Sequence, residues 1–333
     1  MKVIIPVAGF GTRLRPHTLT NPKVLLNVGG KPMIHYIIEQ LIKDKIASSI
    51  ILVTGFLGDK IKEYLNDTFK FKFDYVEQEE AKGLGHAVSC ASPFFADKND
   101  EVLIILGDTL FDVDLKKMVN GKLSSIGVKM VEDPRRFGVV EKDKNNIITK
   151  FIEKPASKEI SGSNEAIVGL YYIKNSEKLF QSLSYIMDNK ITGKGEYQLT
   201  DALENMISNK EKMTTFYVEG WLDCGKPETL LETNRYLLEK NKRVKMKNVK
   251  TFINSQFIMP VYIGKDVTIE NSVIGPYATI NDNCSIKNCV IQDSILEKFS
   301  TIENCALTGS IIGEGASVKR ELLKLSIGNY SEI

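Results

Sequence analysis

The last third of the chain carries an internal repeat that few folds can accommodate. After residue 250, aliphatic residues recur every five or six positions, and every third one falls 17, 16 and 16 residues further on, at Ile263, Ile280, Leu296 and Ile312. A three-sided coil needs one inward aliphatic residue on each side, so this spacing predicts a short left-handed parallel β-helix of about three coils. An antiparallel β-sandwich would repeat about every 8–12 residues with alternating polarity, and we rank it lower.

The first 240 residues follow a different pattern. Short β-branched runs alternate with longer helical segments, which is typical of a mostly parallel sheet with helices on both faces. The expected strands include residues 3–7, 49–54, 71–76 and 102–106, with more antiparallel additions at 127–131, 138–141, 147–152 and 166–173. The expected helices cover residues 33–45, 59–66, 83–91, 176–187, 197–208 and 228–240. We therefore expect a Rossmann-like α/β domain over residues 1–240, followed by a linker and the β-helix over residues 241–333.

Composition excludes several classes of protein. The chain has 333 residues, 43% of them hydrophobic and 26% charged, with a formal net charge of +2, so no overall field attracts nucleic acid or an anionic membrane. No apolar run approaches the roughly 20 residues of a membrane-spanning helix. Five scattered cysteines without a C-x-x-C pair favour neither a zinc ribbon nor a disulfide framework, and we expect a cytoplasmic protein.

A glycine turn follows the first expected strand. Gly9 and Gly11 stand where the carboxyl end of a parallel strand would present a ligand site, although the segment is neither a Walker A loop nor a G-x-G-x-x-G motif. Cations and prolines follow at Arg13, Arg15, Pro16, Pro22, Lys23, Lys31 and Pro32. Fixed cations beside a glycine turn suit a polyphosphate. A solvated basic loop would explain the charges but not the combination of glycines and prolines.

Residues 9–33 resemble the opening signature of the sugar-1-phosphate nucleotidylyltransferases. Their sequence is G-F-G-T-R-L-R-P-H-T-L-T-N-P-K-V-L-L-N-V-G-G-K-P-M. The resemblance continues in family order through residues 78–87, 106–108, 137–140, 153–155, 195–201 and 221–225, and it covers essentially residues 1–240. The tail is similar to that of the family's longer members. The resemblance implies Mg²⁺-dependent transfer of a nucleotidyl group from UTP or dTTP to a sugar 1-phosphate, with release of pyrophosphate.

The resemblance also implies roles for particular residues. Arg13 and Lys23 match residues that hold the triphosphate and the departing pyrophosphate, and Lys154 matches the residue that fixes the sugar phosphate. Asp108 and Asp223 would hold the metal. The remaining nucleotide contacts would be Ala8, Gly9, Gly11, Thr12, Gln78, Gly83 and Gly107, and the remaining sugar contacts Gly138, Glu153, Val168 and Glu196.

Two aspartates at the carboxyl edge of the sheet suit Mg²⁺. Asp108 follows the expected strand 102–106 and Asp223 follows an expected strand at 215–218, so both can face one cleft. Magnesium is commonly bound by one or two carboxylates together with phosphate oxygens. Alternatively, Asp108 only caps the turn at residues 107–109. A direct in-line displacement needs no nucleophilic side chain.

The substrates are less constrained than the reaction. The Gln78 amide can read the edge of uracil or thymine, and Gly83 lets the backbone approach the ring. The resemblance slightly favours UTP over dTTP and leaves both open, and glucose 1-phosphate is the default sugar. Two alternatives remain. One is an acyltransferase or bifunctional enzyme that uses the coils; the sequence has no histidine after His86, so the coils lack the usual imidazole base for acyl transfer. The other is a catalytically silent nucleotide-sugar sensor. We expect a homodimer or homotetramer, with the coils serving subunit packing or regulation.

Overall fold

The computed structural model describes residues 1–95, 100–155, 163–193, 195–240 and 250–323, together with residues 326 and 329. The described chain packs as two compact units: residues 1–26 with 32–225, and residues 27–31 with 226–333. The expected domains were residues 1–240 and 241–333. The packing differs at this boundary, because the helix at residues 227–240 belongs to the same unit as the coil. Residues 241–249, at the start of the expected linker and coil, lie outside the described residues.

The first unit is built on one mixed sheet of nine strands. Its main order is β10-β9-β11-β6-β1-β4-β5, and β8 joins β11 and carries β12 on its other side. These strands are β1 (Lys2–Pro6), β4 (Ser49–Thr54), β5 (Phe73–Glu77), β6 (Val102–Ile105), β8 (Ser124–Met130), β9 (Gly138–Lys142), β10 (Ile148–Glu153), β11 (Glu165–Ile173) and β12 (Met213–Tyr217). The strands β6, β1, β4 and β5 are parallel, as the sequence predicts, and β11 runs antiparallel to β6, β8 and β9.

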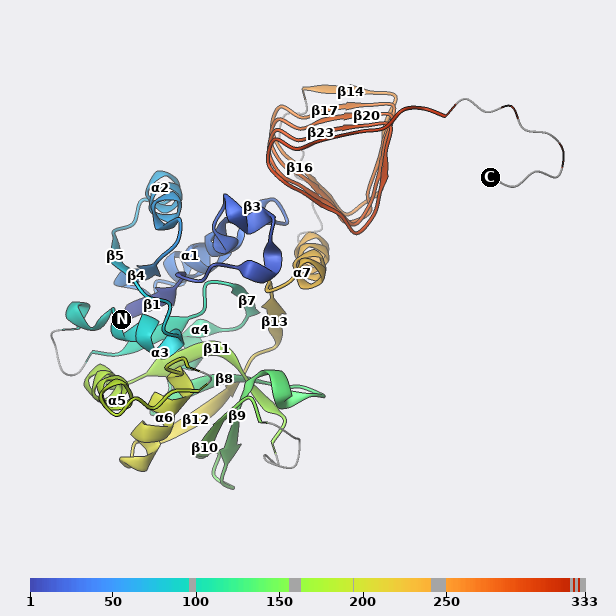
Figure 1. The fold of residues 1–333 in the computed structure, drawn as a ribbon. Helices are drawn as coiled ribbons and strands as arrows, with labels where there is room; N and C mark the ends of the chain where they lie inside the picture. The colour runs from blue at the N-terminus through green and yellow to red at the C-terminus, as the bar shows by residue number, and fades with distance from the viewer. Residues whose placement is uncertain are drawn as a thin grey trace. The chain divides into compact units, whose positions relative to one another are not determined.

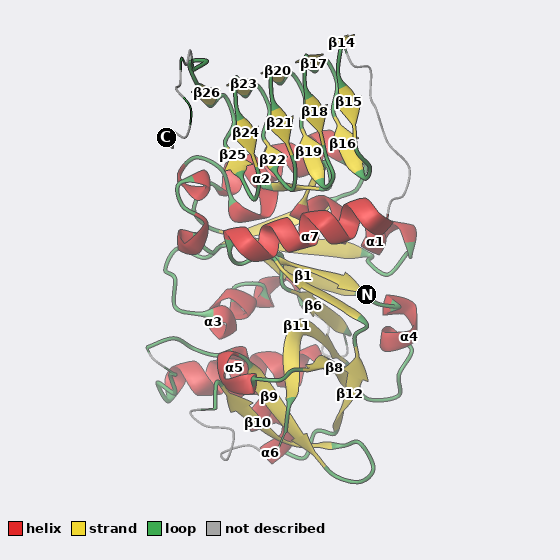
Figure 2. Cartoon of the chain, turned by 90° about the vertical axis from the view of Figure 1, so that its right-hand side faces the viewer, coloured by secondary structure: helices red, strands yellow, loops and turns green. Residues whose placement is uncertain are grey.

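Helices lie on both sides of this sheet (Figures 1 and 2). They are α1 (Met33–Lys43), α2 (Gly58–Thr68), α3 (Leu84–Ser89), α4 (Leu115–Val119), α5 (Ser176–Asp188) and α6 (Leu199–Ser208). Short 3₁₀ helices are η1 (Thr12–Leu14), η2 (His17–Leu19), η3 (Lys23–Leu25), η4 (Ser92–Phe94) and η5 (Pro134–Arg136). Val3, Ile4 and Ile5 of β1 are all fully buried, although successive side chains point to opposite faces. The central strands are therefore covered on both faces, which explains their continuous apolar sequence.

Two short ladders were not expected from the sequence. β7 (Thr109–Asp112) pairs antiparallel with β13 (Gly220–Asp223), and β2 (Asn27–Val28) pairs with β3 (Lys31–Pro32). Both are too short to carry a hydrophobic period. None of the helices in the described parts of the chain has the length and hydrophobicity that a membrane-spanning segment needs.

The second unit contains helix α7 (Pro227–Lys240) and a coil of stacked parallel strands, consistent with a left-handed β-helix (Figure 2). One side of the coil has β14 (Thr251–Ile253), β17 (Thr268–Glu270), β20 (Ser285–Lys287), β23 (Thr301–Glu303) and β26 (Ser317–Lys319). A second side has β15 (Gln256–Phe257), β18 (Val273–Ile274), β21 (Val290–Ile291) and β24 (Ala306–Leu307). The third side has β16 (Val261–Ile263), β19 (Ala278–Ile280), β22 (Ile295–Leu296) and β25 (Ile311–Ile312).

The coil is one turn longer than the sequence predicts. Four strands stack on each of two sides and five on the third, so the estimate of about three coils was wrong. In the first coil Phe252 takes the register of Ile269, and Phe257 takes that of Ile274. The two rings stack with centroids 4.8 Å apart. Aromatic residues thus replace the aliphatic ones at these two positions, and the aliphatic repeat begins only at Ile263, on the third side of the first coil.

Asparagines at one corner of the coil form a ladder. Asn254, Asn271, Asn288 and Asn304 all have positive φ, a backbone region that asparagine enters more readily than most residues. Each side-chain amide donates to the carbonyl of the next, at N···O distances of 3.1, 3.2 and 2.8 Å. The sequence analysis followed the aliphatic repeat alone and did not identify this asparagine repeat.

We expect Asn288→Ala to lower the free energy of unfolding by about 2–3 kcal/mol, because it loses two ladder bonds of about 1 kcal/mol each and places alanine at positive φ. Asn283→Ala is the matched control, since Asn283 has the same backbone conformation (φ 61°) at an exposed corner outside the ladder. Urea unfolding measures both. Equal losses in the two variants would show that the ladder contributes nothing.

Candidate active site

The glycine turn and Asp108 leave the sheet at the same edge. β1 and β6 are parallel neighbours, and the Gly107 amide donates to the Pro6 carbonyl at 3.4 Å just past the end of β6. A Cβ on Gly107 would lie 2.5 Å from Cγ1 of Val7, so close packing of the two strand ends requires glycine here. The turn after β1 and the carboxylate after β6 therefore share the carboxyl edge, where open α/β sheets bind ligands.

The glycine turn is folded back on itself. Gly11 has φ 63°, and its carbonyl accepts a hydrogen bond of 2.8 Å from the Thr18 hydroxyl. A Cβ on Gly11 would lie 3.1 Å from Cβ of Lys23, which brings the turn against η3. At Gly9, by contrast, an added Cβ would meet no heavy atom of the described residues within 4 Å. Gly9 and Thr12 are exposed and Ala8 is half-buried, so this backbone is accessible to a ligand.

Lys23 and Asp108 form an ion pair at this edge. Lys23 Nζ lies 2.6 Å from Asp108 Oδ2, with the lysine side chain 9% exposed and the aspartate side chain 38% exposed. Burial acts to raise the pKa of the Asp108 carboxyl. The charge and hydrogen bond of Lys23, together with the hydrogen bonds from Thr109 and the backbone, outweigh burial and leave the pKa below its ordinary value. The Asp108 carboxyl is therefore ionised at neutral pH.

Asp223 and Arg13 converge on the same place. The β7–β13 ladder pairs Asp223 with Thr109, the residue after Asp108, and the Cys224 amide donates to the Asp108 carbonyl at 3.2 Å. A Cβ on Gly225 would lie 2.9 Å from Asp223 Oδ1 and 3.1 Å from Arg13 Nη2. The predicted pair of carboxylates and the predicted pair of cations are thus brought together, with β13 rather than β12 carrying Asp223.

The donor set suits a hard divalent cation. Asp108 Oδ2 contacts Lys23 and Oδ1 accepts a 3.3 Å hydrogen bond from the Thr109 hydroxyl, while Asp223 lies beside them. Among the described residues, no three His, Cys, Asp or Glu side chains gather as a metal site. A metal at these two carboxylates would need phosphate oxygens to complete its shell, which is how Mg²⁺ is commonly bound.

Gln78 is held beside the N-terminus of α3. Its side chain is 9% exposed, and its Nε2 lies 3.1 Å from the Gly83 carbonyl and 3.0 Å from His86 Nδ1. Burial lowers the pKa of His86, and Lys82 lowers it further against the effect of Glu80, so the ring is neutral at pH 7 and Nδ1 can accept a hydrogen bond from the Gln78 amide. His86 was not among the predicted site residues; a polar side chain three residues after Gly83 was the available signal.

The segment predicted to bind the base, around Gly83, packs against the segment predicted to bind the sugar, around Glu196. Gly83 has φ 100°, and a Cβ there would lie 2.8 Å from Cβ of Glu196 and 2.7 Å from the Tyr197 carbonyl oxygen. The Gly85 amide donates to that carbonyl, and the Tyr197 amide donates to the Lys82 carbonyl, both at 2.8 Å. Only glycine at position 83 permits this approach.

Glu153 lies at the centre of a second polar group. Its Oε2 accepts a 3.0 Å hydrogen bond from the Thr200 hydroxyl and would lie 3.0 Å from a Cβ on Gly138. Its Oε1 lies 3.1 Å from Lys154 Nζ, and Lys154 has φ 45°. Thr200 was missed because its hydroxyl gives no sequence signal by itself. Val168 is 2% exposed and packs near Gly127, so only its backbone could meet a sugar.

Comparison with known proteins identifies the family. A model of the nucleotidyl transferases matches residues 2–240. The chain belongs to the nucleotidyl transferase family. Its relatives include the bifunctional protein GlmU of Methanocaldococcus jannaschii, 34% identical over 95% of this chain and 78% of that protein. The glucose-1-phosphate thymidylyltransferase of Streptomyces antibioticus is 29% identical over 100% of this chain and 99% of that protein.

Solved structures agree with the fold of this nucleotidyl transferase. A UDP-glucose pyrophosphorylase complexed with UDP-glucose superposes with a TM-score of 0.61 at 28% identity, covering 73% of this chain and 99% of that one. The sequence-based expectation of a sugar-1-phosphate nucleotidylyltransferase fold with a C-terminal coil is confirmed.

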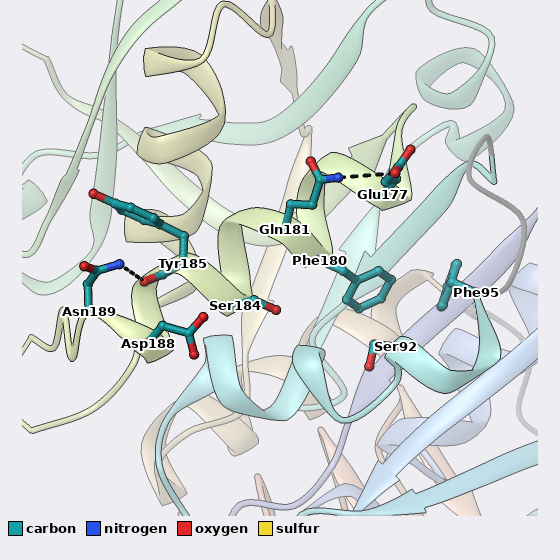
Figure 3. Close-up of a pocket in the computed structure, with 9 residues that line it drawn as sticks. All are labelled: Ser92, Phe95, Glu177, Phe180, Gln181, Ser184, Tyr185, Asp188 and Asn189. Carbon is teal, nitrogen blue, oxygen red and sulfur yellow. Dashed lines mark hydrogen bonds between the residues drawn. The ribbon is translucent and has the colours of Figure 1, made fainter.

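A surface hollow elsewhere in the transferase is separate from this edge. It measures about 640 Å³ and lies along α5 and η4 (Figure 3). Phe95 and Phe180 line it with ring centroids 5.1 Å apart. None of the predicted site residues lines this hollow, so we do not assign it to the reaction.

We expect His86→Phe to raise the KM for the nucleoside triphosphate about 5–10-fold, because Gln78 loses a hydrogen bond worth about 1 kcal/mol. His86→Asn, which can present an oxygen near the Nδ1 position, is the control and keeps most of the affinity. Since burial lowers the pKa of His86, the neutral acceptor is lost as pH falls through that lowered value. Steady-state kinetics from pH 8 to about pH 5.5 should therefore show a KM rise in the parent protein that His86→Phe lacks.

Proposed function

We propose that this chain transfers a nucleotidyl group from UTP or dTTP to a sugar 1-phosphate, with glucose 1-phosphate as the default acceptor. The observation that carries the proposal is the convergence of Arg13, Lys23, Asp108 and Asp223 at the carboxyl edge of the sheet. Two cations and two carboxylates fit a polyphosphate accompanied by a divalent metal.

Charge neutralisation is the main task of such a site. Two substrates that both carry phosphate repel each other by about 4 kcal/mol for each pair of unit charges 4 Å apart at an effective dielectric constant near 20. Arg13 and Lys23 would bind the triphosphate and the departing pyrophosphate. Lys154 would hold the sugar phosphate, beside the hydroxyl-binding Glu153 and Glu196.

The proposed reaction is a direct in-line displacement. An oxygen of the sugar 1-phosphate bonds to the α-phosphorus while the bond from that phosphorus to the bridging oxygen of the β-phosphate breaks, and pyrophosphate leaves with the electron pair. Asp108 and Asp223 would hold Mg²⁺, which stabilises the charge that develops on the phosphate oxygens. Lys23 can exchange its contact with Asp108 for a phosphate when the nucleotide arrives.

The base pocket supports a pyrimidine. Gln78 offers an amide to the edge of the base, with Gly83 and the exposed Gly9 leaving room for the nucleotide. We favour UTP slightly over dTTP. The relatives include a glucose-1-phosphate thymidylyltransferase and a UDP-glucose pyrophosphorylase, so both nucleotides belong in the test.

A pyrophosphate-release screen tests the proposal. Purified protein is given each of five nucleoside triphosphates with several sugar 1-phosphates, in Mg²⁺ and in EDTA. We expect release that needs Mg²⁺, a uridine or thymidine triphosphate and a sugar 1-phosphate. A protein that binds nucleotide sugars but releases no pyrophosphate in any combination is a sensor, and the proposal is then wrong.

The coil suggests one further candidate activity, because several relatives are named bifunctional proteins. Acetyl transfer from acetyl-CoA that survives Asp108→Asn would establish it. The sequence has no histidine after His86, so the coils lack the usual imidazole base and we rank this activity second. We also propose that the protein is cytoplasmic and forms a homodimer or homotetramer. Light scattering of the purified protein measures its molar mass and so tests the oligomeric state.

A further inference from the structure

A short segment that follows Lys23 in sequence, residues 27–31, belongs to the second unit. Residues 27–31 pack with helix α7 and the coil, although they interrupt the first unit in sequence. The Met33 amide donates to the Leu26 carbonyl at 3.2 Å, which closes the base of this loop, and the Leu26 amide donates to the Lys23 carbonyl at 3.1 Å. The loop therefore starts from a residue that is hydrogen-bonded directly to Lys23.

Glu297 holds the start of the loop. This carboxylate, 7% exposed, accepts hydrogen bonds from the Asn27 amide nitrogen at 3.0 Å and from Asn27 Nδ2 at 2.5 Å. Asn281 Nδ2 lies 3.3 Å from the same Oε2. Burial raises the pKa of Glu297, against the effect of its bonds to Asn27. Three hydrogen bonds to one buried carboxylate fix the position of Asn27 much more closely than a contact at the surface would.

Two more contacts hold the rest of the loop. The Gly29 amide donates to Asn234 Oδ1 at 2.9 Å, and Asn234, on α7, is fully buried with its Nδ2 donating to the Tyr277 carbonyl at 3.1 Å. Gly30 has φ 87°, and a Cβ there would lie 2.4 Å from the ring of Tyr262 on β16. The coil and α7 thus hold the loop at three residues: Asn27 and Gly29 through hydrogen bonds to buried side chains, and Gly30 through close packing against the Tyr262 ring.

We propose that Glu297 is a positioning residue for the transfer reaction: by fixing Asn27, the coil sets where Lys23 stands before the triphosphate. The inference rests on the proposed function and gives the coil a role beyond subunit packing. Between Lys23 and Asn27 lie only Val24, Leu25 and Leu26, which are buried, so displacement of Asn27 is transmitted to the lysine. Displacement of a charge-neutralising group by about 1 Å can lower the rate about 100-fold.

Kinetics of four variants test the proposal. Glu297→Gln turns an acceptor of Asn27 into a donor, and Asn27→Ala removes the same bond from the other side while keeping the backbone bond. We expect each to raise the KM for the triphosphate, and for pyrophosphate in the reverse direction, about tenfold, with less than a twofold change in the KM for the sugar phosphate. The double variant Asn27→Asp with Glu297→Gln exchanges donor and acceptor and should recover most of the loss. Glu321→Gln, an exposed acid of the same unit, is the matched control.

Hydrogen–deuterium exchange of the full chain gives a readout that does not depend on activity. Peptides covering residues 17–26 should exchange faster in Glu297→Gln and Asn27→Ala than in the parent protein, and at the parent rate in Glu321→Gln and the double variant. Unchanged exchange in residues 17–26, or triphosphate KM values equal to those of the parent, overturns the proposal. If the parent protein shows no transfer with any substrate, the proposed function fails, and the exchange data alone decide whether the coil positions Lys23.

Discussion

Lys23→Met is expected to lower kcat/KM by about 10²–10³-fold and the free energy of unfolding by about 1–3 kcal/mol. The first loss follows because a cation beside the triphosphate disappears. The second follows because the Asp108 carboxylate loses the ammonium 2.6 Å away, and it is smaller than for a fully buried pair because Asp108 is 38% exposed. Pyrophosphate release and urea unfolding measure the two losses.

The same variant changes the response to acid. Lys23 holds the pKa of Asp108 below its ordinary value, so the pair stabilises the fold above that ordinary value and the contribution is lost as pH falls through the lowered one. Lys23→Met should show a smaller loss of stability between about pH 5 and pH 2. Lys62→Met removes an exposed ion pair with Asp59 on α2 and serves as the control, with a stability change within about 0.5 kcal/mol. Equal effects of Lys23→Met and Lys62→Met would contradict the assigned role of Lys23.

Asp223→Asn is expected to lower kcat by at least about 10²-fold while stability changes by less than about 1 kcal/mol, because it removes a metal-binding charge without changing volume. Titration with Mg²⁺ should require a higher concentration for half-maximal activity. Asp112→Asn is the matched control, because Asp112 lies at the other end of the same β7–β13 ladder, opposite Gly220. A variant Asp223→Asn that releases pyrophosphate at the parent rate would refute the metal assignment.

The elements with long hydrophobic periods could be predicted from the sequence. β4 was expected at residues 49–54 and has those bounds, because a central parallel strand is apolar on both faces and its ends are marked by polar residues. Helix α1 was expected at residues 33–45 and spans Met33–Lys43, with its isoleucines and leucine on the buried face. The sides of the coil were recognised from aliphatic residues spaced by five or six. In each case the spacing of apolar residues follows from which side chains are buried, so it can be read from the sequence.

The contacts that assemble the site could not be predicted in the same way. The β7–β13 ladder joins residues more than 100 positions apart through two four-residue strands, and its half-buried residues have no clear period. The resemblance identified Arg13 and Asp223 individually, but only the crowding at Gly225 places them together. The bond from Asn27 to Glu297 spans 270 positions, and nothing in either local sequence signals it.

The most direct measurement of the central claim is product analysis by mass spectrometry, with purified protein, Mg²⁺, UTP or dTTP, and glucose 1-phosphate. The site as described predicts equal amounts of a nucleotide sugar and pyrophosphate from the parent protein, and neither product above background from Asp108→Asn or Asp223→Asn that unfolds like the parent. Product formed by those variants at the parent rate would contradict the claim that the two carboxylates, opposite Arg13 and Lys23, carry out the transfer.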